Sequence, residues 1–71
     1  MKSIYPNLDE ALRSRNMTKL QLADAIGISK HSIYRRFRGS AEWKLDEMIT
    51  VCTFLETKNA AELFLRLDSI T

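Results

Sequence analysis

Residues 18–39, TKLQLADAIGISKHSIYRRFRG, constrain the fold of this chain more than any other stretch. Thr18 and Gln21 have the spacing of a capping box, in which each side chain bonds the backbone N–H of the other residue, and this predicts a helix start. Gly27 is expected to end that helix, because glycine adopts the left-handed conformation without a steric penalty. Ser29 can then cap a second helix. The segment therefore predicts two short helices joined by a tight turn.

Each of these two helices carries an apolar side at helical spacing, as packing against a core requires. This side consists of Leu22, Ala23 and Ile26 in the first helix, and of Ile33 and Phe37 in the second.

One more helix is predicted before this segment and two after it. Asn7 and Glu10 have capping-box spacing and would open a helix that runs to about Arg15. Its inward residues would be Leu8, Ala11 and Leu12. Residues 44–56 predict a fourth helix. Its expected apolar face consists of Leu45, Met48, Ile49, Cys52 and Leu55.

The fifth helix is predicted from a third capping box, formed by Asn59 and Glu62, and would continue through Leu63, Phe64 and Leu67. No stretch shows the alternation of a half-buried strand. The predicted fold class is all-α, a compact bundle of five short helices.

Seven residues at fixed spacing resemble the helix-turn-helix of the lambdoid phage repressor and Cro family: Thr18, Leu22, Ala23, Gly27, Ser29, Ile33 and Gly39. With the flanking elements, the resemblance covers about residues 7–64. It implies a lambda repressor-like DNA-binding domain, here a single domain over residues 1–71 with its motif at about 18–39. In this family the second helix of the motif enters the major groove of double-stranded DNA.

Two positions depart from the family pattern. Lys19 stands where glutamine is frequent, and Arg36 stands where an apolar residue is usual. Phe37, next to Arg36, is expected to supply the missing core contact. Two roles then remain open for Arg36, a partly buried ion-pair donor or a phosphate ligand.

Positive charge is concentrated on the second helix of the motif and the loop after it. The chain carries a net charge of +2, but residues 28–44 carry +4, residues 1–27 carry +1 and residues 45–71 carry −3. DNA phosphates would attract the basic segment and repel the acidic one. This asymmetry predicts a single DNA-facing side.

The resemblance places the base-reading positions on the helix at residues 29–38. They fall on Lys30, His31, Tyr34 and Arg35. Arg35 is the strongest candidate, because its guanidinium can bond the O6 and N7 of guanine together. The alternative for these basic side chains is a solvated helix face, and for His31 a base or phosphate contact and simple exposure both remain open.

Other side chains are expected to contact the DNA backbone or to support the reading helix. They are Thr18, Lys19, Ser29, Ser32, Arg38, Ser40 and Lys44. The backbone amides at the start of the Lys19 helix favour an anion, and the resemblance implies phosphate contacts in the loop that contains Ser40. Such contacts fix the register on the duplex without reading its sequence.

The resemblance also implies a homodimer on a palindromic operator, since relatives usually bind half-sites about 34 Å apart. The candidate dimer surface consists of Leu63, Phe64, Leu67 and Ile70, with Trp43 as a possible addition. In the alternative, Phe64, Leu67 and Trp43 close the core of the monomer.

Several classes of function are not expected. The sequence offers no paired carboxylates, metal-ligating cluster, nucleophile dyad or phosphate-cradling glycine loop, so neither an enzyme nor a cofactor, metal or small-molecule ligand is predicted. No apolar run approaches the roughly 20 residues of a membrane span. The single Cys52 is predicted to be a buried small hydrophobe, which fits the cytoplasm of a bacterial or phage-infected cell.

The sequence thus predicts a sequence-specific DNA-binding transcriptional regulator of the phage or prophage repressor type. The alternative is a protein-interaction module that uses the same fold to bind a partner protein, as an antitoxin or the target of an antirepressor does. Such a module would bind DNA only non-specifically. The sequence is compatible both with a complete small regulator and with the DNA-binding domain of a longer repressor.

Overall fold

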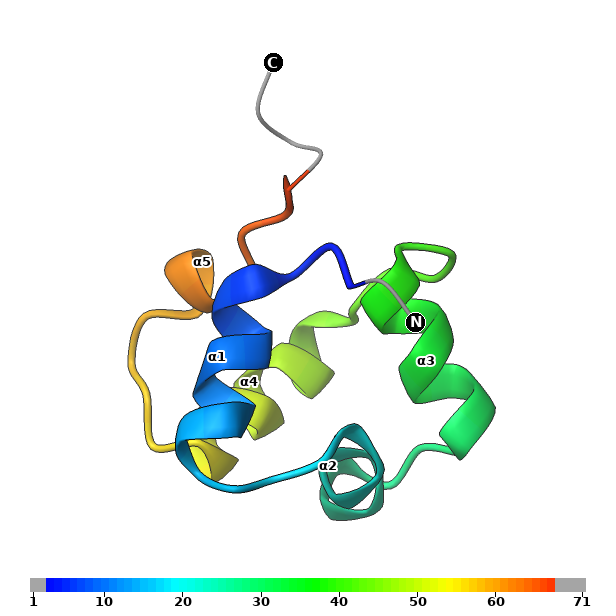
Figure 1. The fold of residues 1–71 in the computed structure, drawn as a ribbon, viewed down its shortest axis with the longest axis horizontal. Helices are drawn as coiled ribbons and strands as arrows, with labels where there is room; N and C mark the ends of the chain where they lie inside the picture. Colours follow the sequence, from blue (N-terminus) through cyan, green and yellow to red (C-terminus); the bar gives the residue numbers. More distant parts are fainter. Residues whose placement is uncertain (1–2, 68–71) are drawn as a thin grey trace.

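The computed structural model describes residues 3–67, which form five α-helices (Figure 1). They are α1 (Pro6–Ser14), α2 (Lys19–Ile26), α3 (Lys30–Arg38), α4 (Leu45–Phe54) and α5 (Ala60–Leu63). No strand occurs among residues 3–67, so the predicted all-α class is confirmed.

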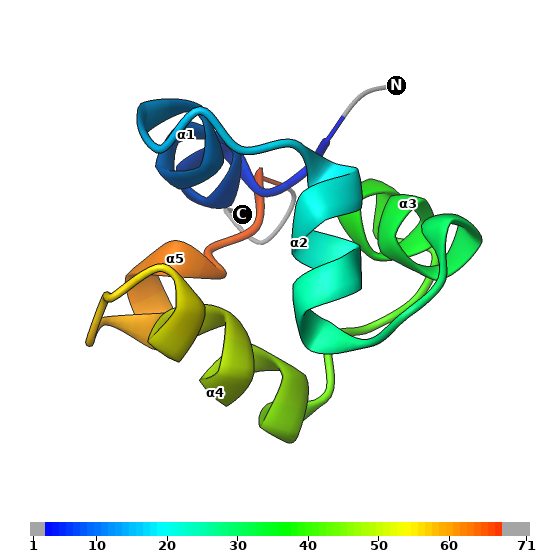
Figure 2. The same ribbon diagram turned by 90° about the horizontal axis from the view of Figure 1, so that it is seen from below.

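The helices leave one side of α3 uncovered. α2 lies between α3 and α4 and contacts both (Figure 2). α5 contacts α1 and α4 on the side of the molecule away from α3. In both views α3 lies at an edge, so no other helix covers its outer side.

Four aromatic rings pack together in the core, three of them buried and Phe64 partly buried. Tyr5, Phe37, Trp43 and Phe64 pack edge to face, with ring centroids 5.1 to 6.4 Å apart. This arrangement matches the ring quadrupoles and adds stability beyond the burial of area. Trp43 is buried in this cluster, so its suggested place on a dimer surface is wrong. Trp43 and Phe64 instead close the core of the monomer, which was the alternative.

The apolar face predicted for α4 is partly wrong. Leu45 and Ile49 are 74% and 58% exposed. The inward residues are Met48, Val51, Cys52 and Leu55. Both sets have helical spacing, because α4 has more apolar residues than one face holds, and packing against α2 and α5 selects the second set. Cys52 is buried as predicted, and burial raises the pKa of its thiol.

Two of the three predicted capping boxes do not form as expected. α1 begins at Pro6 without a side-chain cap, and the Asn7 amide instead donates to the carbonyl of Glu62, 2.8 Å away. Pro6 suits this first position because its missing N–H would have no partner there. The Asn59 side chain caps α5 by accepting from the Glu62 N–H, but the reciprocal bond to the Asn59 N–H is not made.

Helix α5 ends at Leu63, short of the predicted Leu67, because the chain turns back to the N-terminal segment. The N–H of Leu67 donates to the carbonyl of Ile4 at 2.8 Å. The N–H of Ile4 donates in turn to the carbonyl of Phe37 at 2.9 Å. Leu67 is about half exposed, and Ile70, the last residue of the suggested dimer surface, lies outside the described residues. The segment around Ile4 therefore joins the end of α3 to the C-terminal part of the fold.

Candidate nucleic-acid interface

The turn between α2 and α3 is built by the local signals in the sequence. Thr18 Oγ1 accepts from the Gln21 N–H at 3.1 Å, and Gln21 Oε1 accepts from the Thr18 N–H at 2.8 Å. Gly27 ends α2 with φ of +77°, the left-handed region that favours glycine. Ser29 Oγ accepts from the Ser32 N–H at 3.1 Å and caps α3. The predicted capping box, turn and N-cap are confirmed.

The packing of α3 determines which of its side chains face outward. Ile33 and Phe37 are fully buried against the core, as predicted. Four basic or titratable side chains of the helix are exposed: Lys30, His31, Arg35 and Arg38. The ion pairs found among residues 3–67 involve none of these four side chains. The exposed side of α3 therefore carries uncompensated positive charge.

Tyr34 occupies a flank of α3 rather than its outer face. Its ring is partly buried against the core and lines a groove with residues from the start of α2, including Lys19 and Leu20. Of the four predicted base-reading residues, Lys30, His31 and Arg35 are thus exposed and Tyr34 is half-buried.

Lys19 is held by the protein itself. Its ammonium lies 3.4 Å from Asp9 Oδ1 and 4.9 Å from the centroid of the Phe37 ring, and its side chain is 27% exposed. The cation therefore has an ionic partner and an aromatic face, both of which compete with a DNA phosphate. The sequence had no local signal for this contact, because Asp9 lies ten positions earlier in a different helix.

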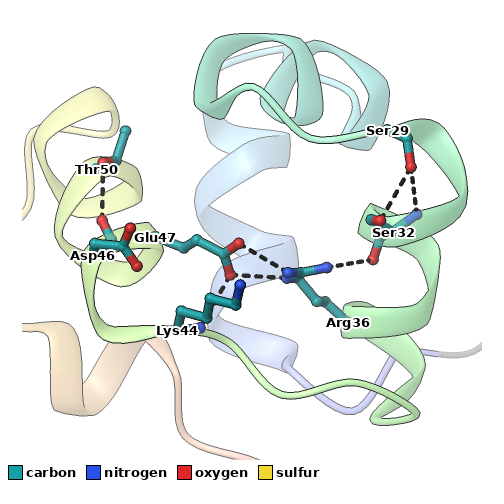
Figure 3. Close-up of polar contacts among 7 residues, drawn as sticks. All are labelled: Ser29, Ser32, Arg36, Lys44, Asp46, Glu47 and Thr50. Atoms are coloured by element: carbon teal, nitrogen blue, oxygen red, sulfur yellow. Dashed lines mark hydrogen bonds and ion pairs between the residues drawn. The ribbon is translucent and has the colours of Figure 1, made fainter.

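Arg36 is an ion-pair donor, which is one of the two roles left open by the sequence. Its Nε donates to Glu47 Oε1 at 2.9 Å, and its Nη2 donates to Glu47 Oε2 at 2.8 Å (Figure 3). The Arg36 Nη1 donates to the carbonyl of Ser32 at 3.3 Å. Both side chains of the pair are only 11% exposed. A fork of this kind fixes orientation as well as distance.

Glu47 also stabilises the start of α4. Its Oε1 accepts from the backbone N–H of Lys44, the N-cap residue, at 3.0 Å. Burial raises the pKa of the Glu47 carboxyl, but the hydrogen bonds from Arg36 and Lys44, with their charges, outweigh this effect and lower the pKa below its usual value. Sequence reasoning missed Glu47 as well, although its place three residues after Lys44 is that of a helix-capping glutamate.

The remaining predicted contact residues lie around α3. Ser29 and Ser32 use their hydroxyls in the cap, with Ser29 Oγ donating to Ser32 Oγ at 3.1 Å. Ser40 and Lys44 lie in the segment between α3 and α4, and both are exposed. The predicted residues therefore fall into an exposed basic helix face, an exposed loop beyond it, and a partly enclosed lysine at the start of α2.

The comparisons with known proteins agree with this geometry. A family model described as a Cro/C1-type HTH DNA-binding domain matches residues 7–65. The chain belongs to this family. Neither a search of curated proteins nor a search of solved structures gave a match.

As a Cro/C1-type domain, the chain is a DNA-binding regulator domain that binds double-stranded DNA. Members of this family are typically not enzymes. None of the helices within residues 3–67 is long and apolar enough to cross a membrane. In the same part of the chain no group of three or more His, Cys, Asp or Glu side chains is placed to hold a metal ion.

Proposed function

We propose that this Cro/C1-type domain is a sequence-specific transcriptional regulator of the phage or prophage repressor type, acting in the cytoplasm and reading the major groove with α3. The observation that carries the proposal is the exposed face of α3, where Lys30, His31, Arg35 and Arg38 have no ionic partner among the described residues. A nine-residue helix is about 13 Å long, at about 1.5 Å per residue. This length suits a groove about 12 Å wide.

In this proposal the residues of α3 divide by their position. Arg35 bonds guanine through its fork, Lys30 and His31 contact neighbouring base edges or phosphates, and Tyr34 contacts a thymine methyl group or a phosphate from the flank. Arg38, Ser40 and Lys44 contact phosphates where the chain leaves α3. Lys19 and Thr18 contact a phosphate on the other side of the groove, for which Lys19 must leave Asp9.

The regulator is further proposed to bind a palindromic operator as a homodimer, because one such helix contacts few base pairs. Of the residues first suggested for the dimer surface, Leu63 is buried and Leu67 is exposed. Leu65, also exposed, adds to the apolar surface near Leu67. The proposed contact therefore involves Leu65 and Leu67.

Selection of preferred sites from a random duplex pool tests this function. The chain is expected to enrich a palindromic site, and Arg35→Ala is expected to relax the preference at one position of each half-site. Lys58→Ala, which removes an exposed cation between α4 and α5, is the control and should leave the selected sequence unchanged. Failure of the unaltered chain to enrich any sequence would overturn the proposal.

A second candidate is a protein-interaction module that binds DNA only non-specifically. It is favoured by the exposure of Leu45 and Ile49 on α4, outside the basic face. In that case the random pool yields no preferred sequence, although binding to any duplex persists at low salt.

A further inference from the structure

The core contacts of α3 determine which side of the helix faces outward, but apolar packing sets its rotation less sharply than a directional contact does. Ile33 and Phe37 are buried by the hydrophobic effect, which has no preferred direction. Base reading requires a defined rotation, because a shift of α3 about its axis moves Arg35 relative to the base edges. A directional contact from α3 to a neighbouring helix would supply this constraint.

Arg36 and Glu47 form such a contact. Their two hydrogen bonds, at 2.9 and 2.8 Å, join α3 to α4 across 11 positions of sequence (Figure 3). Arg36 follows Arg35 directly, so the two side chains project about 100° apart around the helix. The pair therefore lies on a flank of α3 and not on the proposed reading face.

Both ends of the pair are tied to backbone. On α3, Arg36 Nη1 donates to the Ser32 carbonyl at 3.3 Å, which limits the rotamers of the arginine. On α4, Glu47 Oε1 accepts from the Lys44 N–H at 3.0 Å. Lys44 is a proposed phosphate ligand, so the same carboxylate bonds the base-reading helix and the backbone of a residue that fixes the register on DNA.

The pair also removes one positive charge from the interface. Arg36 lies between Arg35 and Phe37 in the most basic segment of the chain, yet its side chain is only 11% exposed and its charge is neutralised by Glu47. A phosphate that took Glu47's place would leave the carboxylate nearly buried without its partner, which is costly.

We propose that Arg36 and Glu47 are positioning residues for sequence reading: the pair sets the rotation of α3 against α4, and Arg36 itself binds no phosphate. This inference rests on the proposed function, because it concerns how the same helix face discriminates between sequences. It predicts that removal of the Arg36 side chain lowers sequence discrimination without lowering the number of phosphates bound.

Two quantities separate positioning from phosphate binding. The first is the slope of log K against log salt on a random duplex, whose magnitude falls by about 0.9 for each phosphate that the protein no longer neutralises. The second is the ratio of the affinity for the selected site to that for the random duplex. Arg36→Met is compared with Arg38→Met, which removes an exposed arginine of the same helix. The measurements are made at a temperature at which circular dichroism shows both variants to be folded.

For Arg36→Met, the salt slope is expected to stay unchanged while the affinity ratio falls about tenfold, the effect of misplacing one bidentate base contact. For Arg38→Met, the slope is expected to fall by about one unit with the ratio unchanged. If Arg36→Met does not fold, Arg36→Lys serves in its place, because lysine keeps the charge but cannot reproduce the fork. It should likewise lower the ratio without lowering the slope.

A slope that falls by about one unit for Arg36→Met, or an affinity ratio that stays unchanged in a folded Arg36 variant, would overturn the inference and leave the proposed function standing. A ratio near one for the unaltered chain would instead overturn the proposed function, and the inference with it.

Discussion

Replacing Glu47 by glutamine is expected to lower the free energy of unfolding by about 2 to 4 kcal/mol at neutral pH. Removing one partner of a fully buried ion pair costs about 3 to 5 kcal/mol, because the other charge stays buried without compensation. Here both side chains retain 11% exposure, and the glutamine oxygen can still accept from the Lys44 N–H, so the expected cost is somewhat smaller.

Glu10→Gln provides the matched control. Glu10 pairs with Arg13 in α1, but the two side chains are 66% and 72% exposed. Exposed pairs of this kind contribute about 0 to 1 kcal/mol, because water screens the charges and the side chains lose entropy. Urea denaturation, monitored by circular dichroism, measures the free energy of unfolding that each variant loses. If the two variants lose the same free energy of unfolding, the fork between Arg36 and Glu47 is not a major source of stability.

The effect of Glu47→Gln should also depend on pH in a defined direction. The folded state lowers the pKa of Glu47 below its usual value of 4.5. A lowered pKa means that the pair stabilises the fold fully above the unfolded pKa, and that this contribution disappears as the pH falls through the folded pKa. The difference in stability between the unaltered chain and Glu47→Gln should therefore shrink below about pH 4. A difference that grows on acidification would contradict the assignment.

Four further substitutions test the local structure and the role of Lys19. Gly39→Ala should destabilise the fold more than Gly27→Ala in thermal denaturation. Both positions have positive φ, which costs about 1 to 2 kcal/mol for alanine. Only at Gly39 would the new Cβ also lie 2.6 Å from Ile4 Cδ1, because Gly27 faces open space. Ser29→Ala should cost about 1 kcal/mol through removal of the α3 cap, measurable by urea denaturation. Asp9→Asn should release the Lys19 ammonium to bind the proposed phosphate. The magnitude of the slope of log K against log salt on random DNA should then increase by up to about one unit.

The features predicted correctly from the sequence depend on residues that are close together in the chain. The capping box of Thr18 and Gln21, the turn at Gly27 and the cap at Ser29 each involve neighbours within three positions, so the residue types alone determine the local conformation. The buried side of α3 follows for the same reason, since Ile33 and Phe37 are the apolar residues at helical spacing in an otherwise polar helix.

The features that could not be predicted depend on which elements pack together. α4 has apolar residues on more than one side, and its packing against α2 and α5 leaves Leu45 outside the core. The partner of Arg36 lies 11 positions away, and the partner of Lys19 lies in another helix. For the candidate site, the sequence therefore identified the exposed basic residues of α3 but not the acidic residues that hold the neighbouring cations.

Protection of guanine N7 from methylation by dimethyl sulfate tests most directly whether α3 reads the major groove through Arg35. The N7 atom is accessible in the major groove, where it is one of the two acceptors for an arginine fork. On the selected site the chain is expected to protect at least one guanine in each half-site, and Arg35→Ala should restore methylation there while other protections remain. Protection that persists fully in Arg35→Ala, or specific binding without any N7 protection, would contradict this account.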